Sequence, residues 1–526
     1  GGSFRRTLLI SLRSRRLWQC LSVHALVPAV WLMNSGPKPD RLELARLEKL
    51  EKIRSLGFDP WGQRFDGHGA IAEVREQCPA ESGTDGPAVR VAGRIMGRRK
   101  AGKLRFIDLQ DQSGSIQLLC SRGDLTEQQW ELVSALDDGD LLGVDGPLRR
   151  TNTGEISIFV RELTVLCKSL SQPPEKFHGL KDEEILVRQR YLDLIYTPGV
   201  LQRMLQRSRI IDSVRQTLRG NGFNEVETPV LHSVAGGAAA RPFITHHNAL
   251  DMPLYLRIAL ELHLKRLLVG GIERVYEIGR VFRNEGVDAT HNPEFTMLEW
   301  YGVGTDWRQQ VLFTEQLVCE VVAAGCRSLG REVPLWCRGQ FGVTTYAEAF
   351  ERSLQLEVFD TDDSELRQAA EGRGVILPES GVLGRDELLN LLLGFCIEPQ
   401  LGQRDGLEFP EFLCDYPASQ AALAVTTESE PRVARRFELY IRGVELCNGY
   451  QELTDPVELR SRDQLQNQKR AEGTTDILPG ASGLLKAMEA GLPECSGVAL
   501  GFDRLVMIAA GVDQLSDVIP FPAERA

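Results

Sequence analysis

The sequence predicts an α+β protein with two folded parts of unequal size. Short alternating strands with polar turns occupy residues 89 to 165, a stretch with two adjacent prolines follows at residues 171 to 180, and helical and strand patterns then alternate to the end. The length of 526 residues suits more than one domain, because a domain has about 150 residues on average. With 42% hydrophobic and 25% charged residues, the composition is that of an ordinary globular protein.

We divide the chain into five predicted segments. They are an extension outside the folded parts at 1–40, a helical segment at 41–85, a β-barrel at 86–170, a linker at 171–190 and the large α+β part at 191–526.

The first 32 residues contain arginines between short apolar runs and no acidic residue. This pattern is typical of an organelle transit peptide or a poor secretory signal. The alternative, which we favour, is that translation starts at Met33 and that the preceding residues belong to no folded unit. The apolar run from Leu21 to Met33 is interrupted and too short to cross a bilayer. We therefore expect a cytoplasmic protein with no membrane partner, and leave import through residues 1–32 open.

Residues 41 to 56 predict an amphipathic helix that ends at Gly57. One apolar stripe comprises Leu44, Leu47, Leu50, Ile53 and Leu56. The basic side chains are expected mostly on the other faces, where they would contact a nucleic-acid backbone or water; they are Arg46, Lys49, Lys52 and Arg54.

Short strands are expected at 89–95, 104–109, 116–120, 141–144 and 156–160. Such strands with glycine-rich turns are typical of a small Greek-key barrel of the oligonucleotide-binding (OB) type, which stacks single-stranded bases on aromatic side chains in a basic groove. Phe106, between basic residues, is the expected stacking platform, and Gln117 on the next strand could contact a base edge. The alternative is that Phe106 belongs to the barrel core.

The net charge of −12 argues against a protein that coats nucleic acid indiscriminately, but it permits a local basic patch. One candidate comprises Arg94, Arg98, Arg99, Lys100, Lys103 and Arg105. The 11 cysteines form no CxxC pair and have no histidine at metal-ligand spacing. This usage predicts isolated reduced thiols rather than a disulfide framework or a zinc site.

The middle of the chain has a pattern that suits nucleotide chemistry. Arg283-Asn284-Glu285 is followed by the segment from His291 to Tyr301. A guanidinium can bind phosphate oxygens in two places, a carboxylate can accept a hydrogen bond from the adenine amino group, and Phe295 can stack on the base. Glu299 and Tyr301 are two residues apart on a predicted strand and so face one side. A solvated charged hairpin is the alternative.

This stretch resembles motif 2 of class II aminoacyl-tRNA synthetases, specifically of the bacterial-type lysyl-tRNA synthetases. Residues 176–180, 188–195, 236–248 and 254–259 read almost letter for letter like these enzymes. Phe223–Pro229 resembles the end of motif 1, which builds the dimer interface in this class, and Gly497–Arg504 resembles motif 3. The resemblance covers residues 41 to 526. It implies a class II catalytic domain, an antiparallel sheet with flanking helices, after an OB-fold anticodon-binding barrel, in a homodimer.

The resemblance also implies the reaction. ATP activates L-lysine to lysyl-adenylate with release of pyrophosphate, and the lysyl group is transferred to the 3′ end of tRNA(Lys). The carboxylate of lysine is already a nucleophile, so catalysis rests on alignment and charge neutralisation. Mg²⁺ is the implied cofactor, with Glu438 and Glu445 at the family's metal positions, because Mg²⁺ on phosphates uses one or two carboxylates. Two exposed carboxylates on a surface strand are the alternative.

The resemblance gives each position a role. Arg283 is expected on the α-phosphate and Arg504 on the γ-phosphate, and these are the expected catalytic residues. His291 is expected near the β- or γ-phosphate. The implied ATP-binding set is Arg283, Glu285, His291, Phe295, Glu438, Asn448 and Arg504.

For lysine, Glu452 is the implied partner of the ε-ammonium, with the hydroxyl of Tyr301 beside it. A desolvated ammonium needs such a carboxylate, so a neutral side chain would be rejected. The implied lysine-binding set is Gly237, Glu261, Glu299, Tyr301, Asn448, Tyr450, Glu452 and Ala499, and the implied anticodon-binding set is Phe106, Gln117 and Glu155.

The last third of the chain departs from the usual synthetase pattern. Tyr416–Ala424 and Cys495–Gly501, with Ala499 where synthetases typically carry glycine, resemble the lysine ligase that modifies translation elongation factor P. That ligase activates lysine, preferably β-lysine, and transfers it to a protein. It lacks the N-terminal barrel, so the barrel of this chain favours tRNA as the acceptor. An elongation factor P (β-)lysine ligase-like enzyme and a non-catalytic tRNA-binding paralogue are the alternatives.

Overall fold

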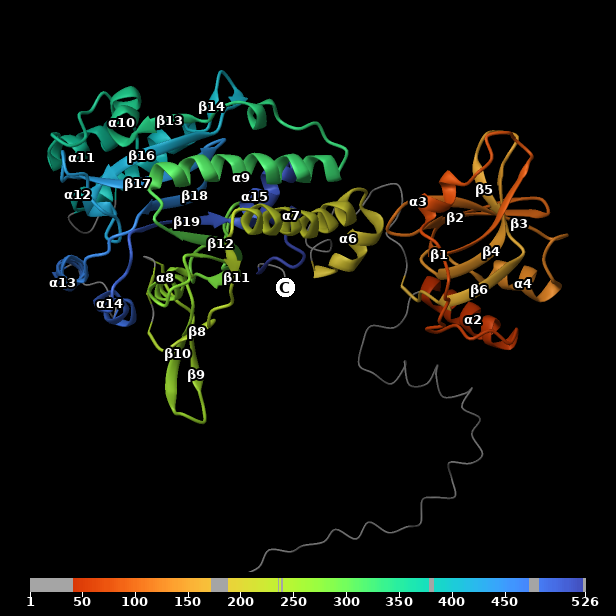
Figure 1. The fold of residues 1–526 in the computed structure, drawn as a ribbon. Coiled ribbons are helices and arrows are strands. Elements are labelled where there is room, and N and C mark those ends of the chain that lie inside the picture. Colours follow the sequence, from red (N-terminus) through yellow and green to blue (C-terminus); the bar gives the residue numbers. More distant parts are fainter. Residues whose placement is uncertain are drawn as a thin grey trace, which may run out of the picture. The chain divides into compact units, whose positions relative to one another are not determined.

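The structure is a computed structural model that describes residues 41–171, 188–234, 236–237, 240–377, 383–472 and 482–523. The chain divides into two compact units, residues 1–179 and 180–526 (Figure 1). The predicted N-terminal extension, with the interpretations of residues 1–32, lies outside the described residues. So does most of the predicted linker.

The first unit is a six-stranded barrel with three helices among its described residues. Strand β1 pairs with both β2 and β4, so the sheet order β1-β2-β3-β5-β4-β6 closes on itself. The five predicted strands are present, but the prediction omitted β6, which follows β5 after two residues and reads as its continuation. The elements are α2 (Arg41–Ser55), α3 (Ile71–Glu76), β1 (Asp85–Ala101), β2 (Leu104–Gln110), β3 (Ser115–Ser121), α4 (Glu127–Ala135), β4 (Leu141–Arg150), β5 (Ile156–Phe159) and β6 (Glu162–Cys167).

Burial alternates along the barrel strands, as expected for a sheet with one face on a core. On β2, the side chains of Ile107 and Leu109 are buried in the barrel core. Phe106, the residue before Ile107, lies on the opposite face of the strand and is half-buried. Phe106 is therefore no core residue, and the alternative interpretation of this side chain was wrong.

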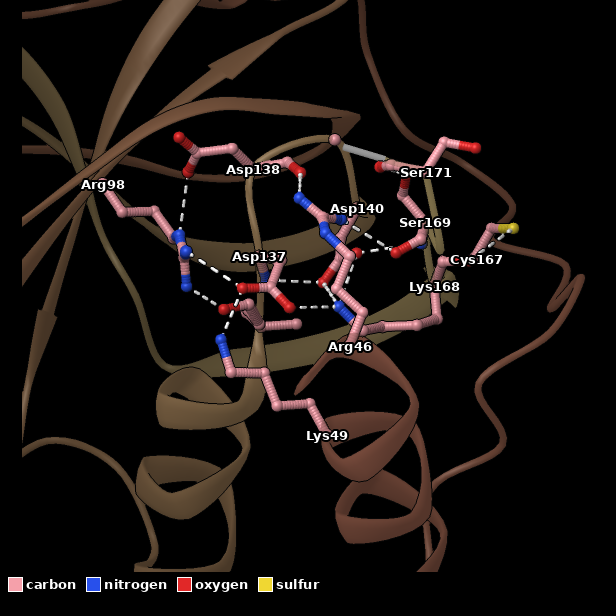
Figure 2. A network of polar contacts seen from close by, with 12 residues as sticks. Arg46, Lys49, Arg98, Asp137, Asp138, Asp140, Cys167, Lys168, Ser169 and Ser171 are labelled. Carbon is pink, nitrogen blue, oxygen red and sulfur yellow. Dashed lines mark hydrogen bonds and ion pairs between the residues drawn. The ribbon is translucent and has the colours of Figure 1, made fainter. Parts of the chain in front are cut away.

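A buried network of charges ties helix α2 to the barrel (Figure 2). The ammonium of Lys168, after β6, is fully buried and lies 2.8 Å from Asp137 and 3.0 Å from Asp140. Lys49 of α2 contacts the other oxygen of Asp137 at 2.5 Å, and Arg46 donates to the carbonyl of Ser169 at 2.9 Å. Burial opposes ionisation of Asp137, but the hydrogen bonds and charges of the two lysines outweigh it and hold its pKa below the usual value.

This network corrects the expectation for two basic residues of the first helix. Arg46 is buried, and Lys49 points at Asp137 rather than at water or a nucleic acid. The loop after α4 supplies the buried anions, which the long cationic side chains reach along their apolar stems.

The second unit contains an eight-stranded sheet in the order β13-β16-β17-β18-β19-β12-β11-β7. Its β13–β16 and β11–β7 pairs are parallel and its other neighbouring pairs are antiparallel. The predicted fold class is confirmed. The strands are β7 (Asn224–Glu225), β11 (Arg274–Phe282), β12 (Glu294–Val303), β13 (Gly342–Thr345), β16 (Glu411–Pro417), β17 (Val433–Ile441), β18 (Val444–Gln451) and β19 (Cys495–Gly501).

Helices cover one face of this sheet and leave the other for polar residues. In Figure 1, α7, α9 and α15 run along the sheet, and they pack on one another. Leu298 and Trp300 of β12 share a core with Val318 and Val321 of α9. The alternate residues of β12, Glu299 and Tyr301, therefore face the opposite side.

The remaining elements surround this sheet. They are α6 (Arg190–Tyr196), α7 (Val200–Gly220), β8 (Leu231–His232), β9 (Ile244–His247), β10 (Met252–Leu256), α8 (Glu261–Val269), α9 (Trp307–Ser328), α10 (Tyr346–Leu354), α11 (Asp363–Gly372), α12 (Arg385–Leu392), α13 (Pro456–Glu472), α14 (Ser482–Glu489) and α15 (Phe502–Ala510), with short pairs and turns between them. Where the chain is described, each helix is too short or too polar to cross a bilayer. The ten cysteines in those ranges are free thiols.

The charge network predicts a sensitive position in the barrel. The substitution Lys168→Met removes the cation that Asp137 and Asp140 share. This should lower the free energy of unfolding by about 3–5 kcal/mol. Hydrogen–deuterium exchange of β4 and β6 in the full chain measures this loss locally. Lys103→Met, at an exposed lysine of the same unit, is the control and should leave exchange unchanged. Equal protection in the two variants would contradict the network's role.

Candidate active site

The polar face of the large sheet carries predicted site residues in two neighbouring rows. The first row crosses four strands as Glu299 on β12, Ala499 on β19, Asn448 on β18 and Glu438 on β17. Two residues further along, Tyr301, Gly497 and Tyr450 lie opposite one another. Because residues i and i+2 of a strand share a face, both rows line one surface. The fold thus brings together residues that are up to about 200 positions apart in the sequence.

Three predicted carboxylates converge beside these rows. Glu261 begins α8, and Glu452 follows β18; these two and Glu299 are at most 4% exposed. Glu299 Oε1 accepts a hydrogen bond from the backbone N–H of Leu260 at 3.0 Å, and its Oε2 accepts one from the Tyr301 hydroxyl at 3.2 Å. The Tyr450 hydroxyl donates to Glu261 Oε2 at 3.3 Å. We call this set the acidic pocket.

A lysine of the chain itself lies inside the acidic pocket, and the sequence analysis missed it. Lys265 Nζ contacts Glu261 Oε1 at 2.5 Å and is also ion-paired with Glu452 Oε2. The signal that could have found this residue is the spacing of Glu261 and Lys265, four positions apart on an apolar helix.

Burial makes two of these carboxyls weak acids. Burial, with the nearby charge of Glu261, raises the pKa of Glu299 to about 7. Burial likewise raises the pKa of Glu452 to about 8, although the charge of Lys265 opposes this. The acidic pocket therefore changes its charge near neutral pH.

Two glycines, Gly497 and Gly237, shape the wall of the acidic pocket. A Cβ at Gly497 would overlap the ring of Tyr301, so glycine is needed for this ring to lie flat on β19. Gly237 has a φ of +95° and sits against Ala259 and Leu262, beside Glu261. Ala499, where the sequence departs from the synthetase pattern, is half-buried between Glu299 and Asn448.

The predicted ATP residues form two contacts. The guanidinium of Arg283, after β11, lies 5.3 Å from the centre of the Phe295 ring. Arg504 of α15 contacts His291 Nε2 at 3.0 Å and donates to the carbonyl of Glu445 at 2.6 Å. Glu285 is exposed in the loop between β11 and β12, and no described residue hydrogen bonds to its side chain.

Glu438 and Glu445, the predicted metal ligands, lie on neighbouring strands β17 and β18. Glu438 Oε2 accepts hydrogen bonds of 2.6 Å from the hydroxyls of Tyr416 and Tyr440, and its Oε1 is ion-paired with Arg436. Partial burial and the charge of Glu438 raise the pKa of Glu445. Two hard oxygen donors that repel each other fit Mg²⁺, which would be held mainly by phosphates and water. The described ranges hold no group of three or more His, Cys, Asp or Glu side chains able to enclose a metal.

The predicted anticodon residues share one outer face of the barrel. Phe106 and Gln117 are half-buried on the paired strands β2 and β3, and Gln117 Oε1 accepts a hydrogen bond from Ser157 at 3.1 Å. Glu155 is exposed two residues before Ser157, whose strand β5 pairs with β3. The guanidinium of Arg99 lies 5.9 Å from the Phe106 ring.

The basic patch beside them is smaller than the sequence suggests. Arg94 donates to the carbonyl of Gly139 at 2.6 Å, and Arg98 pairs with Asp138 at 2.8 Å, so both belong to the charge network of Figure 2 or its surroundings. Arg99, Lys100 and Lys103 are exposed.

Comparison with known sequences agrees with this fold and site. The profile of the tRNA synthetases class II (D, K and N) matches residues 182–525, and the profile of an OB-fold nucleic acid binding domain of the tRNA anticodon type matches residues 89–166. The chain belongs to the class II aminoacyl-tRNA synthetases.

The similar curated proteins narrow the family. A lysine–tRNA ligase from Moorella thermoacetica is 43% identical over 491 residues, which are 92% of this chain and 98% of that protein. Those from Enterococcus faecalis and Synechococcus are 41% and 42% identical over 92% of this chain and 97% and 99% of their own lengths. Within its class, the chain therefore belongs to the lysine–tRNA ligase family, and the predicted family is confirmed. The predicted segment bounds and the roles of single residues stay predictions.

Proposed function

We propose that the protein activates L-lysine with ATP to lysyl-adenylate and transfers the lysyl group to the 3′ end of tRNA(Lys). The observation that carries this proposal is the acidic pocket, in which Glu261, Glu299 and Glu452 are almost completely buried. Buried carboxylates are costly unless cations pair with them. A lysine substrate supplies two ammonium groups, and the relatives named lysine–tRNA ligases support the same substrate.

Adenylate formation needs the lysine carboxylate close to the α-phosphate of ATP. Two observations support Arg283 for this role: its charge lowers the pKa of Glu299, and its guanidinium lies over the Phe295 ring. It can hold the carboxylate and the α-phosphate together while Phe295 stacks on adenine. Asn448 also helps to hold the lysine carboxylate and the α-phosphate together. Glu285 accepts a hydrogen bond from the adenine amino group when ATP is bound. Arg504 and His291, in contact with each other, hold the β- and γ-phosphates, so charge on the leaving pyrophosphate is neutralised.

Glu438 and Glu445 are the proposed Mg²⁺ ligands. When bound, the ion supplies charge neutralisation on the phosphates. Arg504 lies 3.8 Å from the Glu445 carboxylate, and this contact supports a proposed metal ligand next to the proposed γ-phosphate side chain.

The proposed partners are tRNA(Lys) at the barrel and a second copy of the chain. The segment that resembles motif 1 is followed by exposed apolar residues, since Val230 is 38% and Leu231 49% exposed. Large contiguous apolar patches are typical of interaction surfaces, and these residues would contribute to one if a homodimer forms through this segment. We place the enzyme in the cytoplasm, where it would meet tRNA.

The two alternative functions are less well supported. The barrel and the lysine–tRNA ligase relatives favour tRNA over elongation factor P as the acceptor. The acidic pocket argues against a non-catalytic paralogue, because such a protein would have no need to bury three carboxylates.

A charging assay with both acceptors tests the proposal. We offer tRNA(Lys) and elongation factor P side by side, each with α-lysine and β-lysine, and measure which acceptor carries the label. We expect α-lysine on tRNA. Lysylated elongation factor P, or a preference for β-lysine, would overturn the proposal in favour of the ligase. Absence of lysine-dependent ATP–pyrophosphate exchange would favour the non-catalytic paralogue.

The two arginines should be needed for activation itself. Arg283→Ala and Arg504→Ala each remove a charge from the reacting phosphates, and the loss of one such donor typically costs a factor of about 10²–10³ in rate. Lysine-dependent ATP–pyrophosphate exchange measures the effect. Arg373→Ala, at an exposed arginine of the same unit, is the control. Near-parental exchange in either site variant would remove that arginine from the proposed site.

The barrel should affect tRNA and leave activation unchanged. Phe106→Ala should weaken tRNA binding by about 1–3 kcal/mol, the usual value of one base stack, with normal ATP–pyrophosphate exchange. Phe395→Ala, at a phenylalanine that is 66% exposed in the second unit, is the control. If the Phe106 variant binds and charges tRNA like the parent, then Phe106 does not stack on an anticodon base.

A further inference from the structure

The acidic pocket contains a cation before any substrate arrives. The side chain of Lys265 is 1% exposed, and its ammonium lies between Glu261 and Glu452, which come from different elements. The rings of Tyr301 and Tyr450 enclose it, with their centres 5.9 and 5.7 Å from Nζ. A buried lysine is stable as an ammonium only with such partners, so Lys265 and the two carboxylates form one unit.

Lys265 contacts only one oxygen of each of the two carboxylates. Glu261 uses Oε1 for Lys265 and has Oε2 toward the Tyr450 hydroxyl. Glu452 uses Oε2 for Lys265, and its buried Oε1 has no hydrogen-bond donor among the described side chains and backbone. A buried acceptor without a donor is costly. Lys265 therefore leaves one oxygen of Glu452 without a donor, and an ammonium that reached this oxygen could supply one while Lys265 stays in place.

The charges of the pocket also match the substrate when Lys265 is counted. With all three carboxyl groups deprotonated, which requires a pH above the pKa values of Glu299 and Glu452, the carboxylates and the Lys265 ammonium together carry two negative charges. Lysine brings two ammonium groups, and its carboxylate belongs to the side of Arg283 in the proposed function. Without Lys265, one carboxylate would stay uncompensated and would take up a proton, because an unpaired buried charge is not tolerated.

We infer that Lys265 is a positioning residue of the lysine pocket, a permanent counter-ion that holds Glu261 and Glu452 in place and favours the charged form of Glu452 for the incoming ammonium groups. This inference rests on the proposed function, since it assumes that lysine enters this pocket. The rival interpretation is that Lys265 fills the place of the substrate's ammonium and must withdraw. The Glu452 oxygen that lacks a donor and the full burial of Lys265 favour the permanent counter-ion.

The ionisable groups around Lys265 predict the direction in which the pH dependence should shift when Lys265 is removed. The ionisable groups that face Lys265 are Glu261 on its own helix, Glu299 and Tyr301 on β12, Tyr450 and Glu452 at the end of β18, and Cys495 on β19. Burial raises the pKa of Glu452 to about 8, and the charge of Lys265 is the largest influence that lowers it. Removing Lys265 should raise this pKa further, so the ionised form that binds lysine would appear only at higher pH.

The test is Lys265→Met, which keeps an unbranched side chain only one atom shorter and removes its charge. In ATP–pyrophosphate exchange with the full-length enzyme, we expect the KM for lysine to rise about tenfold or more near neutral pH, the equivalent of one pKa unit. The KM for ATP should stay close to that of the parent. The acid limb of kcat/KM for lysine should move to higher pH. Lys486→Met, at an exposed lysine of α14 next to α8, is the matched control and should change none of these.

Several outcomes would overturn the inference. An unchanged lysine KM and acid limb would show that Lys265 does not act on the pocket, and a lower lysine KM would support the rival interpretation. A parallel loss for lysine and ATP without a shift of the limb would indicate a merely structural role. If the parent enzyme itself lacks lysine-dependent exchange, the proposed function fails instead, which separates the two failures.

A second variant covers the case in which Lys265→Met does not fold. Lys265→Arg keeps the positive charge but replaces the compact ammonium by a planar fork. It should raise the KM for lysine through altered geometry and leave the acid limb at the pH of the parent. A limb that moves to higher pH in Lys265→Arg would contradict the counter-ion role.

Discussion

The alternation of side chains across the large antiparallel sheet is the constraint on which the rest of the second unit depends. Leu298 and Trp300 enter the apolar core beneath α9, and this burial fixes the register of β12. The same register turns Glu299 and Tyr301 to the opposite face. A slip of one residue would bury the carboxylate under the helices and expose the tryptophan, so the hydrophobic core positions the charged site.

The polar side of the sheet carries carboxyl groups whose burial costs free energy. Glu299 and Glu452 are desolvated enough that their pKa values rise to about 7 and 8. Backbone and hydroxyl donors offset part of this cost, and Lys265 offsets more. The remaining deficit can be met by a ligand that carries positive charge. In the proposed function, this uncompensated burial would favour a substrate that carries positive charge.

The sequence allowed the local part of this arrangement to be predicted and not the long-range pairing. Arg283, Glu299 and Tyr301 lie in one continuous segment, so strand periodicity was enough to put the last two on one face. Lys265 escaped because its second partner, Glu452, is 187 positions away. Arg46 was misassigned for the same reason, since its acceptors at Asp138 and Ser169 lie in distant loops. The sixth barrel strand was missed because two residues separate it from β5.

The two rows of the site concern two different features of the substrate, the position of its amine and the charge of its distal ammonium. Ala499 lies in the row of Glu299 and Asn448, and we propose that Glu299 holds the α-amine of lysine and that Asn448 holds its carboxylate. Tyr301 and Tyr450 lie in the other row, toward Glu452 at the proposed ε-ammonium end. α-Lysine and β-lysine differ in the position of the amine relative to the carboxylate and share the distal ammonium. The methyl group of Ala499 can therefore affect the choice between the isomers, while the charge requirement at Glu452 and Lys265 is the same for both.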